Sequence, residues 1–411
     1  MKLTYRHTRY ACYLGYITQA IVNNLSPLLF LIFQQEFHVS LTQISLIITL
    51  NFAIQMTVDL IAAKYVDRIG YRFSIVAAQI FATIGILGLC LFPFFLPGYP
   101  ALLLATAISA IGGGILEVLV SPLVEALPSD HKQSEMSLLH SFYCWGQMGV
   151  VILSTGFFVL FGKESWRILP VFWAILPFMN AFLFLKAPIC TLDEQGETTP
   201  LRSLFKQSLF WIFLLLMLCA GSSELAMSQW ASLFSELGLQ VSKTVGDLLG
   251  PCLFAALMGL SRLYFGKAHN FSLKKALIAS GILCAFSYAL TIFSPWPLLS
   301  LIGCGLSGLA VGLMWPGVYS LAAEKIPRGG TAMFAFLALA GDIGCCSGPS
   351  LVGAVSDQVL TKGHSLITAL LPLAPLEQAA LKTGFLYAII FPVLLVTGMI
   401  MLHRMDKRKL S

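Results

Sequence analysis

Long apolar stretches follow one another along almost the whole chain, and they constrain the fold more than any other feature. A helix that crosses a membrane needs about 20 mostly apolar residues. Twelve stretches of the 411-residue sequence meet this requirement: 10–33, 41–63, 74–95, 101–127, 138–162, 167–187, 208–236, 244–266, 275–295, 298–322, 332–358 and 380–403. The sequence therefore predicts an all-α membrane protein with 12 transmembrane helices.

The composition excludes a water-soluble protein. Only 11% of the residues are charged and 57% are hydrophobic, whereas a soluble domain carries about 25% charged residues. The first apolar stretch has no small-residue cleavage site, so we expect a spanning helix and not a removed signal peptide. The 10 cysteines lie mostly in apolar runs, without CxxC pairs or metal-ligand spacing, and are expected to be small packing residues. We expect neither a metal nor a cofactor.

Lysine and arginine set the expected orientation in the membrane, because they are concentrated in cytoplasmic loops. With the amino terminus inside, 20 of the 25 fall on the cytoplasmic side. The five on the outer side are Lys163, Arg167, Lys243, Lys362 and Lys382. Both termini are therefore predicted to be cytoplasmic, in the cell membrane and, for a bacterial protein, the inner membrane. The net charge of +6 follows from this topology and does not indicate nucleic-acid binding.

One polar stretch, residues 188–207, separates the sixth apolar segment from the seventh. It predicts a cytoplasmic linker between an N-terminal half (1–187) and a C-terminal half (208–411), each of six helices. Short segments recur in the two halves in the same order: Glu125-Ala-Leu-Pro128 with Glu324-Lys-Ile-Pro327, and Gly146-Gln147-Met-Gly149 with Gly341-Asp342-Ile-Gly344. They indicate two pseudo-symmetric repeats, an architecture that places a substrate site near the membrane midplane between the halves.

Acidic residues inside the predicted spans are the first candidates for function, because an ionisable group in a bilayer is costly. Glu117 lies in the fourth span, Glu224 in the seventh and Asp342 in the eleventh. A carboxyl in such a setting can exist neutral as well as charged, so all three are candidate proton-coupling residues. The alternative for each is a neutral group that only hydrogen-bonds within the bundle.

Other polar and aromatic residues in the spans could bind a solute. Carboxylates and amides offer acceptors and donors to hydroxyl groups, and aromatic rings stack on a sugar face. The candidate substrate-binding residues include two of the acids and are Asn23, Asn24, Glu117, His140, Trp145, Gln147, Glu224, Gln229 and Trp230. The alternative is that these side chains only hold neighbouring helices together.

The loop after the second span, residues 63–72, carries a recognisable charge pattern. It resembles the cytoplasmic signature loop of the major facilitator superfamily, and the matching residues are Asp67, Arg68, Gly70 and Arg72. Two positions depart from the family pattern, where Ala63 replaces a glycine and Tyr71 a basic residue. In that family the loop is a charge latch between the halves, which implies a gating role for the four matching residues. We expect Asp59, near the inner end of the second span, to take part in the latch.

The fourth and fifth spans resemble those of the fucose:proton symporter family. The resemblance rests on Leu116-Glu117 with Ser121-Pro122, on residues 136–146, and on Asn23-Asn24-Leu25 in the first span. That family uses a membrane glutamate for sugar and proton, which implies this role for Glu117. The family's acid in the first helix is absent here, where Ser26-Pro27 stands.

These observations predict a secondary active transporter of a small polar solute, by resemblance a sugar, which works by alternating access and proton symport. We expect it to be a monomer whose partners are the solute, protons and the lipid bilayer. No Walker loop, Gly-x-Ser-x-Gly elbow, HExxH or dinucleotide motif is present, so no enzyme is expected. The alternatives are an exporter of drugs or metabolites with the same fold, and a membrane sensor that binds solute without moving it. Import or export, and symport or uniport, are left open.

Overall fold

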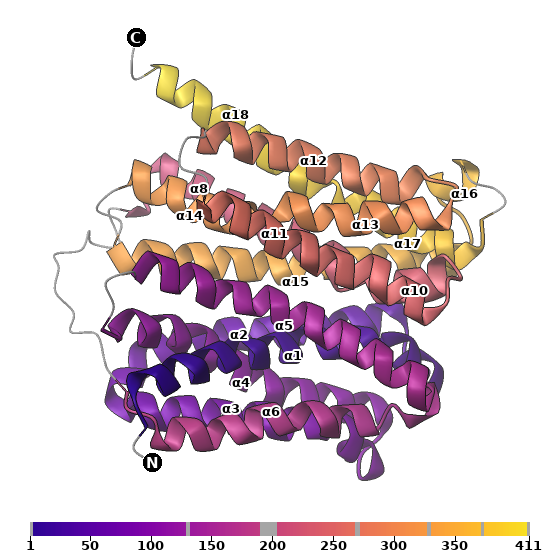
Figure 1. Cartoon of the computed structure of the whole chain (residues 1–411). Helices are drawn as coiled ribbons and strands as arrows, with labels where there is room; N and C mark the ends of the chain where they lie inside the picture. Colours follow the sequence, from indigo (N-terminus) through magenta and orange to yellow (C-terminus); the bar gives the residue numbers. More distant parts are fainter. Residues whose placement is uncertain are drawn as a thin grey trace. The chain divides into compact units, whose positions relative to one another are not determined.

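The computed structural model describes residues 3–128, 132–189, 204–267, 272–326, 330–370 and 374–408, and every regular element in these ranges is a helix (Figure 1). Twelve helical segments are long and apolar enough to cross a membrane, with mean hydropathies from 1.3 to 2.5. Each overlaps one of the 12 predicted stretches, so the predicted all-α membrane fold is confirmed. The chain divides into two compact units, Met1–Glu194 and Gln195–Ser411, called here the N-terminal and C-terminal units.

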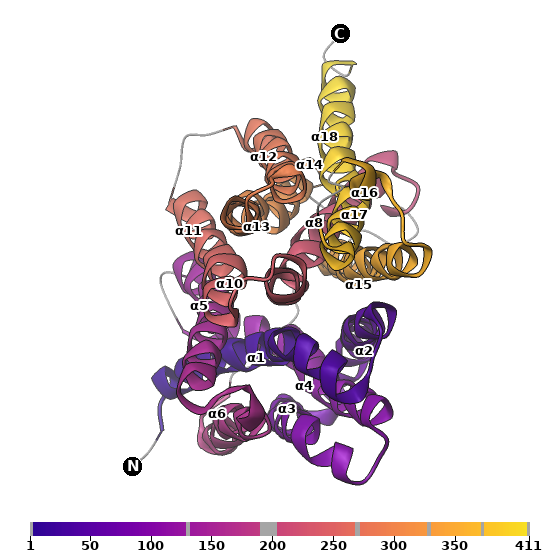
Figure 2. The same ribbon diagram turned by 90° about the vertical axis from the view of Figure 1, so that its right-hand side faces the viewer.

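The described part of the N-terminal unit consists of six long helices and two short 3₁₀ turns. They are α1 (Tyr5–Phe37), α2 (Leu41–Ile69), α3 (Tyr71–Leu91), η1 (Phe92–Phe94), α4 (Gly98–Ala126), α5 (Lys132–Phe161), η2 (Lys163–Ser165) and α6 (Ile168–Lys186). Helix α4 packs against α1, α2, α3 and α5, and α1 packs in addition against α5 and α6. Figure 2, which looks along the helices, shows α1 and α4 between the others. Most side chains of the α1 span and more than half of those of the α4 span are therefore buried.

Two backbone positions with positive φ separate the first three helices. Helix α1 ends where His38 adopts a left-handed conformation, with φ 53°. Helix α3 begins after Gly70, whose φ of 98° is one that residues with a Cβ rarely adopt. A glycine is favoured there because it lacks the Cβ that makes this region costly. The backbone conformation thus explains why a glycine stands at position 70.

Consecutive glycines on α4 let neighbouring backbones come close. A Cβ placed on Gly112 would lie 2.5 Å from the carbonyl oxygen of Ala78 on α3. A Cβ on Gly114 would lie 3.0 Å from the backbone of Gln55 on α2. Small residues at helix contacts in membranes allow this approach. The glycine run therefore brings the Gln55 side of α2 against α4.

The C-terminal unit has the same six-span plan, with more pieces. Its described elements are α8 (Ser208–Ser228), α9 (Ala231–Leu233), η3 (Phe234–Gly238), α10 (Lys243–Asp247), η4 (Leu248–Cys252), α11 (Leu253–Lys267), α12 (Leu273–Phe293), α13 (Pro297–Val311), α14 (Met314–Lys325), α15 (Gly330–Lys362), α16 (Leu366–Leu370), α17 (Leu376–Ala388) and α18 (Ile390–Arg408). Elements η3 and η4 are π-helical. Helix α15 packs against α8 and α17, and α12 packs against α13 and α18.

Prolines account for two of the interruptions in this unit. Pro316 has no N–H, and its ring crowds the carbonyl four residues back, at Gly312. The tenth span accordingly breaks at Gly312–Leu313 between α13 and α14. Pro251 lies inside the π-helical η4, where the wider hydrogen-bond spacing accommodates it.

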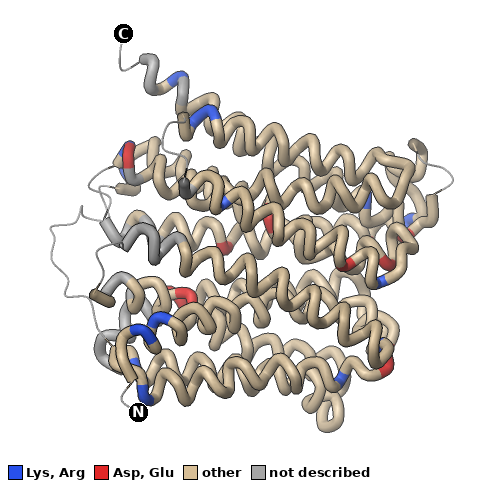
Figure 3. Tube along the Cα trace, viewed as in Figure 1, with Lys and Arg blue, Asp and Glu red and all other residues tan. Residues whose placement is uncertain are grey.

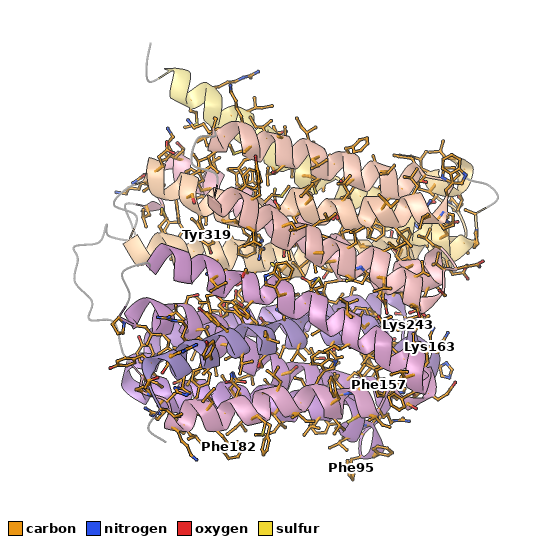
Figure 4. The ribbon with its side chains drawn as sticks, in the orientation of Figure 1. Phe95, Phe157, Lys163, Phe182, Lys243 and Tyr319 are labelled. Atoms are coloured by element: carbon orange, nitrogen blue, oxygen red, sulfur yellow. The ribbon has the colours of Figure 1, made fainter. Side chains whose placement is uncertain are left out.

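The surface of each unit suits a lipid environment. Figure 3 shows that charged residues lie mostly near the helix ends, with uncharged helix between them. Phe95 and Phe182 lie on the outer edge of the N-terminal unit and are exposed (Figure 4). Large exposed apolar side chains of this kind are unfavourable in water and favourable against lipid tails.

Candidate functional site

Glu117 on α4 meets a glutamine of α1 inside the N-terminal unit. The Nε2 of Gln19 donates a hydrogen bond to the Glu117 Oε2 at 2.7 Å. Gln19 is only 4% exposed, and Glu117 is partly buried. The other polar atom of Gln19, Oε1, is buried and has no hydrogen-bond partner in the described part of the chain. The predicted membrane glutamate is therefore held by a neutral amide.

One turn further along α1, Asn23 is the centre of a group of amides. Its Oδ1 accepts hydrogen bonds from Asn51 Nδ2 at 3.0 Å and from Gln55 Nε2 at 2.8 Å, both on α2. Its Nδ2 lies 3.4 Å from the hydroxyl of Tyr143 on α5. All three amides are at least nine-tenths buried. Three helices thus contribute to one hydrogen-bonded group.

The backbone of α4 brings these two groups together. A Cβ on Gly113, one turn before Glu117, would lie 3.3 Å from the carboxamide carbon of Gln55. We call the joined set the N-terminal polar cluster, which consists of Gln19, Asn23, Asn51, Gln55, Glu117 and Tyr143. It is a set of neutral donors and acceptors with one ionisable carboxyl, deep in the spans. Such a set can bind hydroxyl groups and can take up one proton.

His140 and Asn24 lie beside this cluster. The Tyr16 hydroxyl on α1 is 2.9 Å from the Ser121 Oγ on α4, and its ring lies 5.2 Å from the imidazole of His140 on α5. His140 is exposed. Asn24 donates mainly to the backbone carbonyl of Ala20, at 2.9 Å, and its Nδ2 is 3.5 Å from the Tyr143 hydroxyl.

The remaining candidates on α5 are less closely placed. Trp145 is partly buried and Gln147 is 3% exposed. Among the described residues no hydrogen bond joins either one to the N-terminal polar cluster. A substrate-binding role for Trp145 and Gln147 stays a prediction.

In the C-terminal unit, Glu224 has a charged partner. The Arg262 Nη2 on α11 lies 3.7 Å from the Glu224 Oε2 on α8. Glu224 is 7% exposed, and its charge is compensated by the guanidinium. A paired buried charge is far less costly than an isolated one. Arg262, one of the 20 lysines and arginines predicted for the cytoplasmic side, is therefore a partner for a membrane acid.

The other candidates of the C-terminal unit lie in close helix packing. Helix α8 ends at Ser228, and the seventh span is interrupted at Gln229–Trp230. Trp230 is fully buried, and its Nε1 donates to the carbonyl of Pro349 on α15 at 3.1 Å. Gln229, directly after the end of α8, and Asp342, on α15, are also buried. Trp230 therefore ties α8 to α15, and the ligand contacts expected for these three residues stay predictions.

The predicted latch is described only in part. The backbone of Asp67 and Arg68 is the last turn of α2, but their side chains lie outside the described residues. The Arg72 Nη1 donates to the carbonyls of Phe184 and Leu185, both at 2.8 Å, at the carboxyl end of α6. A cation there is favourable against the helix dipole.

Asp59, the last of the gating candidates, is partly buried on α2. In this region the structure thus describes one arginine bound within its own unit and one partly buried acid. The gating role of the loop stays a prediction.

Family comparison decides the class of protein. The model of the Major Facilitator Superfamily matches residues 12–349. The chain belongs to this superfamily. It is a multi-pass membrane transporter and not an enzyme, and its 12 spans are those that the superfamily fold requires.

Solved structures of other transporters share the superfamily fold. A bacterial homolog of the human lysosomal transporter Spinster has a TM-score of 0.73 at 14% identity, with 96% of each chain covered. A D-xylose–proton symporter gives 0.69 at 16% identity, with 94% of this chain and 95% of that chain covered. The nucleoside transporter NupG gives 0.71 at 12% identity, with 96% and 98% covered. At such identities the likeness shows the fold alone. A search of curated protein sequences found no match.

Sequence reasoning missed four members of the N-terminal polar cluster: Gln19, Asn51, Gln55 and Tyr143. One signal was available, because Asn51 and Gln55 are one helical turn apart and share a face of α2. Amides within an apolar helix are equally typical of helix packing. Only the contact with Asn23 separates the two interpretations.

Proposed function

We propose that this superfamily member moves a small neutral polyhydroxylated solute, a sugar, together with a proton, by alternating access. The observation that carries the proposal is the hydrogen bond between Gln19 and Glu117 within the N-terminal polar cluster. It supports a site in which one ionisable carboxyl stands beside several neutral donors and acceptors. Sugar hydroxyls both donate and accept, so they suit carboxamides better than they suit fixed charges.

Glu117 is the first candidate for the proton carrier. Among the described side chains it is hydrogen-bonded to an amide and forms no ion pair. Its protonation therefore removes a buried charge without leaving another charge uncompensated. Protonation of Glu224 would leave Arg262 without its partner at 3.7 Å, which is unfavourable in a span. Glu224 and Asp342 are second candidates.

The same reasoning supports the remaining parts of the proposal. The protein acts as a monomer in the cell membrane, a bacterial inner membrane. Both termini lie in the cytoplasm, because this orientation places 20 of the 25 Lys and Arg on the cytoplasmic side. The loop that contains Asp67, Arg68, Gly70 and Arg72 acts as the gate. The proposal of a sugar as the solute rests on the chemistry of the N-terminal polar cluster and on the resemblance of the first, fourth and fifth spans to the fucose:proton symporter family.

Proton movement in proteoliposomes tests the proposal. The purified protein is reconstituted with a trapped pH dye and challenged with a panel of neutral monosaccharides. We expect one sugar to acidify the vesicle interior, which the trapped dye reports, as it enters with protons. Glu117→Gln should abolish accumulation against a gradient and leave sugar exchange in place. Glu164→Gln, at an exposed glutamate of η2, is the matched control and should behave as the wild type.

Two outcomes would contradict the proposal. Unchanged accumulation in Glu117→Gln would remove the assigned carrier. Silence across the sugar panel, with folded protein in the vesicles, would reject sugar–proton symport and favour the exporter. Faster loss of a drug or dye from cells that express the protein would then identify export.

A further inference from the structure

Gln19 uses only one end of its carboxamide. Its Nε2 is bound to Glu117 at 2.7 Å, while its Oε1 is buried and unpartnered in the described part of the chain. A buried carbonyl without a donor is unfavourable, and native structures seldom leave one. Because Gln19 is 4% exposed, bulk water does not supply that donor. The unpartnered oxygen therefore marks a place for another group.

Two more amide oxygens in the same cluster lack donors. Asn51 Oδ1 and Gln55 Oε1 are buried without hydrogen-bond partners among the described residues, although the nitrogens of both amides bind Asn23. Gln19 and Asn23 lie one turn apart on α1, and Gln55 lies against α4 one turn before Glu117. With Gln19 in the observed orientation, the cluster thus presents three acceptors that need hydrogen donors.

We propose that the carboxamide of Gln19 turns over when Glu117 is protonated and so relays the protonation state to the ligand site. When Glu117 is ionised, the Gln19 NH₂ group binds the carboxylate and Oε1 is left without a donor. When Glu117 carries a proton, its O–H donates to the Gln19 Oε1, and the NH₂ group turns toward the cluster. The terminal torsion of glutamine is broad and roughly two-fold, so both orientations are accessible. The proton stays on Glu117 and no covalent bond changes in the protein.

This turn changes what the cluster can bind. In the ionised state it offers three unpartnered oxygens, which suit only donors. In the protonated state one of these oxygens is replaced by a donor, and the set matches hydroxyl groups, each of which donates and accepts. A polyhydroxylated solute therefore binds better to the protonated protein. By reciprocity the solute also favours protonation, which is the coupling that symport requires. This step rests on the proposed function, in which Glu117 is the proton carrier.

Other ionisable groups lie on the helices that pack against α4, and the test must separate them from Glu117. Among the described side chains they include Arg6, His7, Arg9, Tyr10, Cys12, Tyr13 and Tyr16 on α1, Asp59 on α2, Tyr71 and Arg72 on α3, and His140 and Tyr143 on α5. Arg72 is bound to the end of α6. Asp59 and His140 are ionisable, so their signals must be distinguished from that of Glu117. Variants at Glu117 and Gln19 are therefore needed to assign any signal.

Infrared difference spectroscopy tests the relay without any solute. Full-length protein labelled with ¹³C at the glutamine side-chain carbonyl is placed in phosphatidylcholine–phosphatidylglycerol vesicles and stepped between acid and alkaline pH. We expect a protonated-carboxyl band that is lost in Glu117→Gln, and a ¹³C glutamine band that changes with the same pH midpoint and is lost in Gln19→Met. Gln79→Met is the matched control. Gln79, on α3, is also buried, but it accepts a hydrogen bond from Thr18, which lies on a different face of α1 from Gln19.

The wild-type spectrum alone can overturn the relay, whatever the variants do. A Glu117 band without any accompanying glutamine band means that Gln19 does not turn. A glutamine band that persists in Gln19→Met assigns the change to another residue and also rejects the relay. The first outcome does not depend on whether Gln19→Met folds as well as the wild type, because it is read from the unmodified protein.

A second measurement links the relay to the solute. For the sugar that drives proton movement, the dissociation constants at acid and alkaline pH should differ by about fivefold or more in the wild type and should become nearly equal in Gln19→Met. Gln79→Met should keep the wild-type difference. A glutamine band that follows Glu117, in a protein that moves no sugar with protons, supports the relay and rejects the proposed function. Sugar–proton symport that keeps its full pH dependence in Gln19→Met rejects the relay alone.

Discussion

The guanidinium of Arg262 lies 3.7 Å from the carboxylate of Glu224 and joins α11 to α8 within the C-terminal unit. We expect Glu224→Gln and Arg262→Gln each to lower the stability by about 2 kcal/mol, because each leaves one charge without its partner. The cost is below that of a fully buried pair, since Arg262 is 20% exposed. Thermal unfolding in detergent measures it, and the double variant should recover part of the loss. Additive losses in the double variant would show that the two groups do not interact.

Lys243, labelled in Figure 4, is a buried lysine of the C-terminal unit that forms ion pairs with two acids. Lys243 Nζ lies 3.0 Å from Glu236 Oε1 and 3.1 Å from Asp247 Oδ2, and Asp247 also accepts from Ser232 at 2.6 Å. We expect Lys243→Met to destabilise the unit by about 3–5 kcal/mol, because two buried carboxylates lose their cation. Lys163→Met, at an exposed lysine of η2, is the control. Equal melting temperatures for the two variants would contradict this assignment.

Gly149 and Gly344, which the sequence predicts to be equivalent positions of two repeats, should differ in their tolerance of a methyl group. A Cβ on Gly344 would lie 2.1 Å from the carbonyl oxygen of Leu218, whereas one on Gly149 meets nothing within 4 Å. We expect Gly344→Ala to destabilise by about 3 kcal/mol through forced separation of α8 and α15. Gly149→Ala should be neutral or slightly stabilising, because alanine favours a helix. Thermal unfolding of both variants decides the point, and equal effects would mean that α8 and α15 move apart easily.

The amides of α2 should affect affinity more than turnover. Gln55→Met removes one of the two donors to Asn23 Oδ1 while keeping the length of the side chain. We expect the KM of the transported solute to rise roughly threefold to tenfold, which corresponds to the loss of about one hydrogen bond, with kcat nearly unchanged. Gln79→Met should leave KM unaltered. A fall in kcat at constant KM would show that Gln55 acts in a later step than binding.

The sequence predicts the spans because hydropathy alone sets them, and each predicted stretch overlaps an observed one. It also singles out Glu117, since an acid in an apolar helix is rare and costly. It does not predict Gln19 or Gln55, because an amide is recognisable as part of a site only when its neighbour across the helix contact is known. Lys243 was expected as an outer cation, whereas its side chain is only 6% exposed and ion-paired. The count of lysines and arginines predicts on which side of the membrane a residue lies, but it does not predict whether the side chain is buried.

The interruptions of the C-terminal unit have a mechanical consequence. In the N-terminal unit the spans run as single α-helices, apart from the short η1 turn that ends the third. In the C-terminal unit the seventh, eighth, tenth and twelfth spans each consist of several pieces, with breaks at places such as Gly312–Leu313 and beside Ile389. A continuous helix bends only by straining its hydrogen bonds, whereas a broken one already has a joint. The two units, each with six spans, therefore differ in stiffness: the helices of the N-terminal unit resist bending, whereas those of the C-terminal unit can bend at their breaks.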